Sequence, residues 1–208
     1  MSGWRSTVAR RVLDGTTLSR KILDEQLESV LTTMQAATVL DIGGAGGGRY
    51  RGLVAHHQYW SVDVQPKNRP SLQADAHDLP LRDGVADLVL CLQVLEHCRD
   101  PRRVVEEAYR VLKPGGRLVL STVLIYELHG SPHDYYRFTE SALLDLARQF
   151  KQARCIAMGN RFVAAYDLLA ARSLLLNSLF GRLAFSVGRT AQAACPTGYV
   201  LVAQKDAS

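Results

Sequence analysis

Apolar residues recur at two different spacings along this chain, and the spacings predict helices alternating with strands. From Leu18 to Ala36 they return every three or four positions, which predicts an amphipathic helix. Short apolar runs, each bounded by acidic, proline or glycine residues, then predict buried strands. These runs cover residues 39–42, 59–64, 86–92 and 117–123. The alternation indicates an α/β fold built on an open sheet.

Helix signals lie between the predicted strands. Residues 49–57 follow the first strand and should form the first crossover helix. Asp100 and Pro101 begin another helix, because aspartate is favoured at the N-cap and proline at the first helical position. The run 113–116 (Lys-Pro-Gly-Gly) ends that helix, and Thr139 is expected to cap a later one.

The first predicted strand runs directly into a glycine-rich loop, Gly43 to Gly48. Glycine accepts positive φ at little steric cost and lets a ligand approach the bare backbone. A strand that ends in such a loop is the usual place where an open α/β sheet holds a nucleotide-like cofactor. The loop is therefore the first candidate for a binding site.

The spacing of the loop discriminates between cofactors. The dinucleotide fingerprint G-x-G-x-x-G fails in either possible register, which disfavours an NAD-dependent oxidoreductase. Asp41, Gly43 and Gly47 instead match acid-x-G-x-G-x-G, with Ala45 in place of the middle glycine. That loop resembles the one of class I S-adenosylmethionine (SAM) methyltransferases. An acid suits SAM, because SAM carries an ammonium group and a sulfonium cation that a carboxylate attracts.

Composition narrows the class of protein only slightly. A chain of 208 residues suits one domain with a real core, and the charge of +5 is mildly basic. No basic run is interleaved with aromatic residues, so no nucleic-acid partner is expected. The four cysteines form no C-x-x-C pair, which argues against a zinc knuckle or a redox dithiol. The N-terminus has no apolar stretch typical of a secretory signal, and we expect a cytoplasmic protein.

Two further acids have positions that suit a bound nucleoside. Asp63 ends the second predicted strand 22 positions after Asp41, the spacing at which a carboxylate takes both ribose hydroxyls. Asp75 lies in a segment, 74–81, that resembles the methyltransferase segment contacting adenine. There an acid meets the adenine amino group and the next backbone N–H meets a ring nitrogen. Asp75 and Ala76 occupy those positions.

Further motifs are in register with the loop and the acids. Residues 95–97 read Leu-Glu-His, residues 100–101 read Asp-Pro, and residues 112–116 read Leu-Lys-Pro-Gly-Gly before an apolar strand. Together these features make residues 38–124 similar to a small class I SAM-dependent methyltransferase of the ubiquinone and small-molecule type. The resemblance implies a Rossmann-like α/β fold. Its sheet has seven mostly parallel strands with helices on both faces, and its last strand is antiparallel.

The resemblance also implies a domain division and a cofactor site. Residues 1–37 are an N-terminal arm and helix, and residues 38–208 are the methyltransferase domain, with a helical insertion at about 160–190 between the last two strands. Residues 153–158 and 199–205 suit those strands. The implied cofactor is SAM. The residues expected to bind it are Asp41, Gly43, Gly44, Ala45, Gly47, Asp63, Val64, Asp75, Ala76 and Gln93.

A metal is less clearly implied. In some ubiquinone-pathway O-methyltransferases a Glu-x-x-Glu-His run at this place holds a divalent metal. Here Gln93 replaces the first glutamate of the run, while Glu96 and His97 remain. The replacement lowers the charge of the ligand set, and the sequence assigns no metal. His97 has a plain alternative as a side chain that packs against the adjoining loop.

The loop of residues 126–138 is the candidate acceptor site, because in the family this loop lines the acceptor pocket. His133 and His129 are the candidate general bases, and His97 is a third candidate. The residues expected to orient the substrate are Tyr135, Tyr136 and Arg137. In the structural alternative, Tyr136 and Phe138 anchor the loop and Arg137 pairs with Asp134.

Methyl transfer to oxygen or nitrogen of a small-molecule acceptor is the function predicted first. Methylation of RNA or protein is an alternative, although no Asn/Asp-Pro-Pro-Tyr/Phe run follows the fourth strand. A SAM-binding regulatory or assembly protein without turnover is another, since Ala45 and Gln93 depart from the family pattern. The apolar segment 162–187 is interpreted as a helical hairpin or lid. Its alternative is an interfacial helix in peripheral contact with a membrane.

Overall fold

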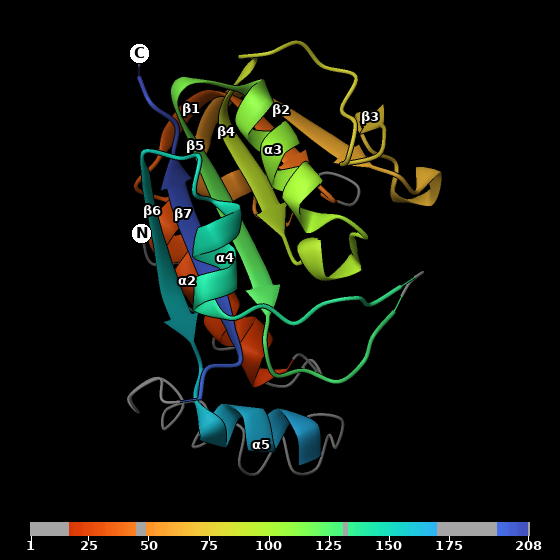
Figure 1. Cartoon of the computed structure of the whole chain (residues 1–208), viewed down its shortest axis with the longest axis vertical. Helices are drawn as coiled ribbons and strands as arrows, with labels where there is room; N and C mark the ends of the chain where they lie inside the picture. The colour runs from red at the N-terminus through yellow and green to blue at the C-terminus, as the bar shows by residue number, and fades with distance from the viewer. Residues whose placement is uncertain (1–16, 45–48, 131–132, 170–194, 208) are drawn as a thin grey trace.

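In the computed structural model, residues 17–44, 49–130, 133–169 and 195–207 are described, and their strands form one seven-stranded sheet (Figure 1). The order across the sheet is β3-β2-β1-β4-β5-β7-β6. The strands are β1 (Gln35–Ile42), β2 (Ala55–Asp63), β3 (Leu72–Gln73), β4 (Ala86–Leu92), β5 (Leu112–Val123), β6 (Gln152–Met158) and β7 (Gly198–Gln204). The helices are α2 (Leu18–Leu31), α3 (Pro101–Val111), α4 (Glu140–Leu146) and α5 (Arg161–Leu169), with 3-10 turns η3 (Arg51–Leu53), η4 (Pro66–Asn68) and η5 (Leu95–His97).

The sheet is parallel from β3 to β5, and β7 runs antiparallel to both of its neighbours, β5 and β6. The prediction of a mostly parallel sheet with an antiparallel last strand is confirmed. The strand order reverses between β1 and β4, which lie side by side. In open α/β sheets a ligand binds in the crevice at the carboxyl ends of the strands where the order reverses.

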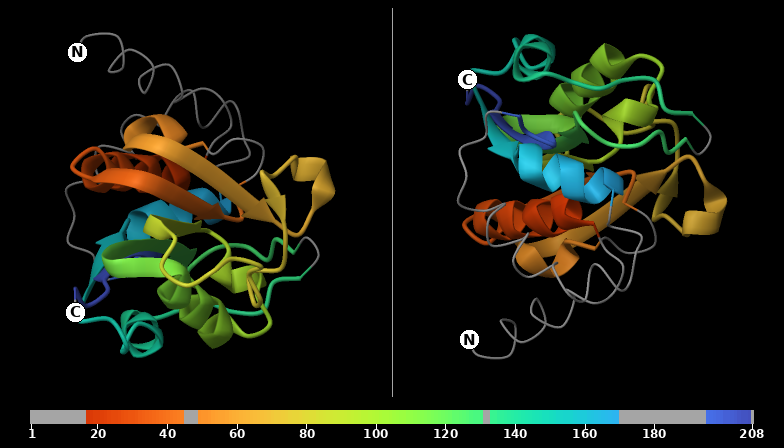
Figure 2. Two further views of the ribbon diagram at one scale, coloured as in Figure 1. Left: turned by 90° about the horizontal axis from the view of Figure 1, so that it is seen from above. Right: turned by 90° about the horizontal axis from the view of Figure 1, so that it is seen from below.

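Helices cover both faces of the sheet (Figure 2). One apolar cluster joins α3 and α4 to strand residues such as Leu40 and Val89. A second cluster on the other face joins α2 and α5 to residues such as Val39 and Leu88. Neighbouring residues of one strand thus enter opposite cores, and for this reason the central strands read as continuous apolar runs. Helices packed on both faces thus hold the carboxyl edge of the sheet in a fixed position.

The helix starts have the caps that the sequence indicates. The Asp100 carboxylate accepts a hydrogen bond from Arg103 N at 3.2 Å, with Pro101 as the first residue of α3. The Thr139 hydroxyl accepts from Ala142 N at 3.3 Å at the start of α4. The first predicted helix, α2, is shorter than expected: it ends at Leu31, because β1 already begins at Gln35.

The predicted crossover helix at residues 49–57 is wrong. The structure has only the short η3 turn there, and β2 begins at Ala55. Gly52 lies in the middle of this segment, where glycine disfavours a helix. The longer β1 also offers a partner, since Gln35 pairs in parallel with Ala55 and Thr38 with Gln58. Strand pairing therefore takes the residues that local preference assigned to a helix.

The predicted insertion between the last two strands is described only in part. Residues 161–169 form α5, whose Val163 is buried against the α2 side of the sheet. Residues 170–194 lie outside the described part of the chain, as does most of the 162–187 segment, so the membrane contact stays a prediction. Within the described ranges, no helix has both the length and the apolar character needed to cross a bilayer. The domain division at residue 38 also stays a prediction.

Candidate active site

A cavity of about 360 Å³ opens at the carboxyl edge of β1, β2 and β4. This volume is in the range of small-molecule sites. It brings together most of the residues predicted to hold the cofactor that the structure describes. The predicted cofactor residues in its wall are Gly43, Asp63, Val64, Asp75, Ala76 and Gln93. Ala45 and Gly47, also predicted, lie outside the described residues.

The first two glycines of the loop are required by sterics. Gly43 has φ of +74°, and a Cβ there would lie 2.4 Å from Val94 Cγ2. A Cβ on Gly44 would lie 2.2 Å from a carboxylate oxygen of Asp41. The backbone of the loop thus passes directly over the carboxylate that ends β1, at a distance that only glycine allows.

Asp41 is buried, and its carboxylate accepts a hydrogen bond from the Tyr59 hydroxyl at 2.6 Å. Burial raises the pKa of Asp41 from 3.8 to about 6, although the hydrogen bond from Tyr59 works in the opposite direction. The same burial and the nearby carboxylate raise the pKa of Tyr59. Burial therefore destabilises the ionised form of Asp41, and a cationic group of a ligand would stabilise it.

The Asp63 carboxylate faces the cavity at the end of β2 and is oriented by its own loop. One oxygen accepts from Gln65 N at 2.7 Å, and the other accepts from the Asn68 amide at 2.8 Å. Each carboxylate oxygen has two lone pairs, so these contacts leave acceptor capacity for a diol. The position is the one expected for a carboxylate that binds ribose hydroxyls.

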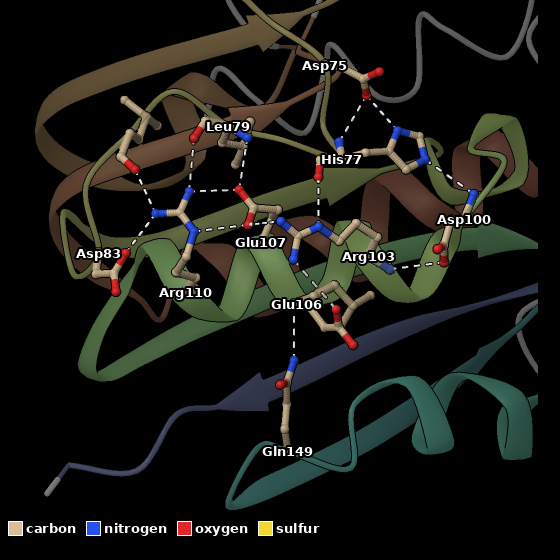
Figure 3. Close-up of polar contacts among 12 residues, drawn as sticks. Asp75, His77, Leu79, Asp83, Asp100, Arg103, Glu106, Glu107, Arg110 and Gln149 are labelled. Carbon is tan, nitrogen blue, oxygen red and sulfur yellow. Dashed lines mark hydrogen bonds and ion pairs between the residues drawn. The ribbon is translucent and has the colours of Figure 1, made fainter.

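Asp75 is exposed and receives hydrogen bonds from His77 N at 2.9 Å and His77 Nδ1 at 2.5 Å (Figure 3). These hydrogen bonds lower the pKa of Asp75, and the bond from the His77 backbone has the largest effect. His77 Nε2 accepts from Asp100 N at 3.3 Å, and its carbonyl oxygen accepts from Arg103 Nε at 3.1 Å. The cavity wall around Asp75 is thereby attached to the start of α3.

The other end of the same loop is attached by Glu107, a buried residue of α3. Its carboxylate accepts from Leu79 N at 2.9 Å and from two nitrogens of Arg110, at 2.7 and 3.0 Å (Figure 3). Arg110 also donates to the Leu79 carbonyl oxygen at 2.9 Å. Hydrogen bonds from Arg110 lower the pKa of Glu107 and keep it ionised.

Gln93, the residue after β4, has a φ of +59°, a region that non-glycine residues rarely adopt. Its backbone N–H donates to the Ser121 carbonyl oxygen at 2.9 Å. Backbone strain of this kind is concentrated at functional sites. Gln93 also lines a second, smaller cavity at the start of α2. That cavity is lined further by Thr17, Ser19, Arg20, Leu23, Val123, Tyr126, His129, Met158 and Thr197.

The three predicted catalytic histidines lie around the junction of the two cavities. His97 and His133 line the larger cavity, and His129 lines the smaller one. The rings of His97 and His129 are 4.9 Å apart between centroids. His97 Nδ1 lies 2.7 Å from the His133 carbonyl oxygen. Glu96, which is fully buried, offers a carboxylate oxygen within 4.8 Å of ring nitrogens of His97 and His129.

The residues predicted to orient the substrate have mixed placements. Tyr135 lines the larger cavity. Arg137 makes two contacts with Asp134, one of them 2.7 Å long, and donates to the Glu127 carbonyl oxygen at 3.1 Å. The Tyr136 hydroxyl donates to the Arg99 carbonyl oxygen at 3.0 Å, and Phe138 is buried. The loop-anchoring alternative thus describes the observed contacts, while the substrate roles of Tyr136 and Arg137 stay predictions.

Sequence reasoning missed the residues that orient the predicted ones. Tyr59 is the partner of Asp41, Asn68 holds Asp63, and His77 holds Asp75. Only His77 had a local signal, because it lies two positions after Asp75 in a turn. The partners of Asp41 and Asp63 depend on the register of β1 and β2 and on the path of the η4 loop.

Comparison with known proteins agrees with this geometry. Residues 40–120 match the family model described as a methyltransferase domain. The chain is 30% identical over 156 residues to malonyl-(acyl-carrier protein) O-methyltransferase of Marinomonas sp. (strain MWYL1), covering 62% of this chain and 57% of that protein. It is 33% identical over 107 residues to ubiquinone biosynthesis O-methyltransferase of Xanthomonas oryzae pv. oryzae, covering 43% of this chain and 44% of that protein.

A solved structure shows the same fold at low sequence identity. Phosphoethanolamine N-methyltransferase 2 of Haemonchus contortus, in complex with SAM, superposes with a TM-score of 0.59 at 18% identity, covering 87% of this chain and 52% of that one. Residues 40–120 thus match a methyltransferase domain, and these similarities support a class I SAM-dependent methyltransferase with SAM as its cofactor. It spans about half the length of the curated relatives that it matches.

Proposed function

We propose that this protein transfers a methyl group from SAM to oxygen or nitrogen of a small-molecule acceptor. The observation that carries the proposal is Gln93, which lines both the larger cavity with its carboxylates and the smaller cavity beside it. SAM in the larger cavity would direct its methyl group toward this residue. The acceptor would then enter from the side of the smaller cavity.

The assignment of SAM follows from the charges in the larger cavity. Asp63 suits the ribose hydroxyls, because its oriented carboxylate retains acceptor capacity. Asp75 and the Ala76 backbone suit the adenine edge in the same wall. Asp41 lies beneath Gly44 and would gain most from the cofactor's ammonium, since its carboxylate is buried and contacts no cationic side chain in the described part of the chain. A pyrophosphate would instead meet the Asp63 and Asp75 carboxylates in the wall of this cavity.

Methyl transfer from SAM needs an aligned nucleophile and, for a hydroxyl acceptor, a base that removes its proton. His133, His129 and His97 are the candidates for this base, as predicted from the sequence. His129 lines the smaller cavity, from which the acceptor would enter, and His133 is exposed in the larger cavity beside Tyr135, with ring centroids 5.2 Å apart. The cytoplasmic location expected from the sequence stays part of this proposal.

The test is methyl transfer from SAM that carries a radioactive methyl group. The protein is incubated with three separate fractions of a cell lysate: small molecules, RNA and protein. We expect label in the small-molecule fraction, and no label with an Asp63→Ala variant. Label found only in RNA or protein would replace the proposed acceptor class. Binding of S-adenosylhomocysteine without any labelled product would favour a regulatory or assembly protein that has lost turnover.

A further inference from the structure

Glu96 carries a buried oxygen that the contacts of the described residues leave unsatisfied. Its side chain is fully buried in the η5 turn, and one carboxylate oxygen, Oε2, accepts a hydrogen bond from the Thr122 hydroxyl at 3.1 Å. The other oxygen, Oε1, has no hydrogen-bond partner among those residues. A buried acceptor without a partner is destabilising, and more so when it is charged. Its presence calls for a ligand that this oxygen binds.

Two histidines beside this oxygen are held in the tautomer that binds metals. His97 Nδ1 lies 2.7 Å from the His133 carbonyl oxygen. A carbonyl oxygen only accepts, so His97 Nδ1 carries the hydrogen and Nε2 keeps a free lone pair. His129 Nδ1 lies 3.3 Å from the Glu127 carbonyl oxygen and 3.4 Å from Asp134 Oδ2, two acceptors that favour a hydrogen on Nδ1 and leave Nε2 of the neutral ring for a metal.

This pattern of outer contacts is typical of metal-binding histidines. Such residues almost always donate their second ring N–H to a carboxylate or a backbone carbonyl. Asp134 is itself held by Arg137, with one contact of 2.7 Å, and its backbone-side partner is His129 N at 3.0 Å. Arg137 thus forms an ion pair with Asp134, and Asp134 in turn contacts both the backbone N–H and the ring of His129.

We propose that Glu96, His97 and His129 bind one divalent cation of the zinc class at the junction of the two cavities. Their ligand atoms lie within 4.8 Å of one another. A four-coordinate ion with bonds of about 2.0–2.1 Å needs its ligand atoms about 3.4 Å apart, so the side chains must close in by about 1 Å. One carboxylate and two imidazoles leave at least one coordination position open, as in catalytic zinc sites.

His129 is the ligand that sequence analysis could not assign. The motif beginning at residue 93 lacks its first glutamate, so the sequence alone assigns no metal to Glu96 and His97. The structure brings a ligand from the loop after β5 to the same place. Two nitrogen ligands also change the preference of the site. Imidazole favours Zn²⁺ or Co²⁺, whereas Mg²⁺ prefers oxygen ligands only.

A cation here would bind an acceptor hydroxyl at its open position and lower the pKa of that hydroxyl. This role rests on the proposed function, but cation binding itself does not. The two are separated by measuring metal binding in the absence of SAM. A protein that binds the cation but methylates nothing would refute the proposed function and leave the metal site intact.

The experiment is a titration of the chelator-treated full chain with Co²⁺, followed by its visible absorption, and then displacement by Zn²⁺ or Mg²⁺. We expect one Co²⁺ per chain, displacement by Zn²⁺, and no displacement by an equal concentration of Mg²⁺. Changes in outer contacts of metal sites weaken affinity by about 10–100-fold, so loss of a ligand should weaken it at least as much. The variants His129→Ala and Glu96→Gln should show that loss.

The control is His57→Ala, which removes an exposed histidine of β2 that lines a different cavity. It should bind Co²⁺ like the wild type. Glu96→Gln alters a fully buried residue, so the decision rests on His129→Ala. Circular dichroism checks that this variant is folded. The proposal is overturned if the wild type binds no stoichiometric Co²⁺. It is equally overturned if folded His129→Ala keeps wild-type affinity, or if Mg²⁺ competes as well as Zn²⁺.

Discussion

Replacing Asp41 with asparagine should make the ligand-free protein more stable and its cofactor binding weaker. The Asp41 carboxylate is buried, and among the described residues the Tyr59 hydroxyl is its one side-chain hydrogen-bond partner. Asparagine has nearly the same shape, and its carbonyl oxygen still accepts from Tyr59. The substitution therefore removes the buried charge and keeps the hydrogen bond.

The size of the effect follows from the pKa of Asp41, which burial raises from 3.8 to about 6. Below about pH 3.8 the carboxyl is protonated in both the folded and unfolded states and has no effect. Between about pH 3.8 and 6 the unfolded state loses the proton first, so stability falls as pH rises. Above about pH 6 both states are ionised, and the loss is constant at about 3 kcal/mol.

Asp41→Asn avoids this loss, although its amide N–H groups also need acceptors. We expect a gain in the free energy of unfolding of about 1–3 kcal/mol at pH 8 and about half of that at pH 5. Urea unfolding at the two pH values measures it, with Asp78→Asn, an exposed carboxyl of the adjacent loop, as the control. A variant no more stable than wild type at pH 8, or a gain independent of pH, would refute the reasoning.

The same variant should bind S-adenosylhomocysteine at least tenfold more weakly, because a hydrogen bond to a charged group contributes about 1.5–3 kcal/mol. Gly44→Ala should abolish binding, since its Cβ would lie 2.2 Å from an Asp41 oxygen. The control Gly52→Ala has no atom within 4 Å of the new Cβ and should bind normally. Calorimetry compares the two variants. Glu107→Ala should lower the free energy of unfolding by about 2 kcal/mol or more, because it removes a buried acceptor. Glu106→Ala, which loses only an exposed ion pair of 3.9 Å, should change it by less than about 0.5 kcal/mol, and equal effects in denaturant unfolding would contradict this difference.

Much of the larger cavity at the carboxyl edge of the sheet was predictable from local sequence, because its residues directly follow strands. Asp63 ends β2 as expected, and Gly43 makes the turn after β1. The caps of α3 and α4 were equally local, since each depends on a side chain and an N–H three residues away. Signals of this kind are complete within a few residues and are not overridden by the rest of the fold.

The parts that failed or were missed depend on contacts between distant segments. Residues 49–57 were assigned to a helix, but the N-terminal half of β1 pairs with them as a strand. The Tyr59 contact to Asp41 exists because the parallel register sets β2 beside β1 in that alignment. His129 reaches Glu96 across a loop whose course the sequence does not specify. These are properties of the register and the loop path rather than of local preference.

We infer that the carboxylates at the ends of β1 and β2 hold SAM. The most direct test is calorimetric titration with S-adenosylhomocysteine and, separately, NAD, using the wild type, Asp63→Ala and Asn68→Ala. Asn68→Ala removes the 2.8 Å contact that orients Asp63 but keeps the Asp63 carboxylate. It therefore separates the effect of a disturbed loop from the effect of losing the carboxylate that would bind the ribose.

We predict micromolar-range binding of S-adenosylhomocysteine to the wild type, weaker binding to Asn68→Ala, no measurable binding to Asp63→Ala, and no binding of NAD. Undiminished binding to Asp63→Ala would contradict the assignment of the site. Binding of NAD in place of S-adenosylhomocysteine would contradict the account of the cofactor itself.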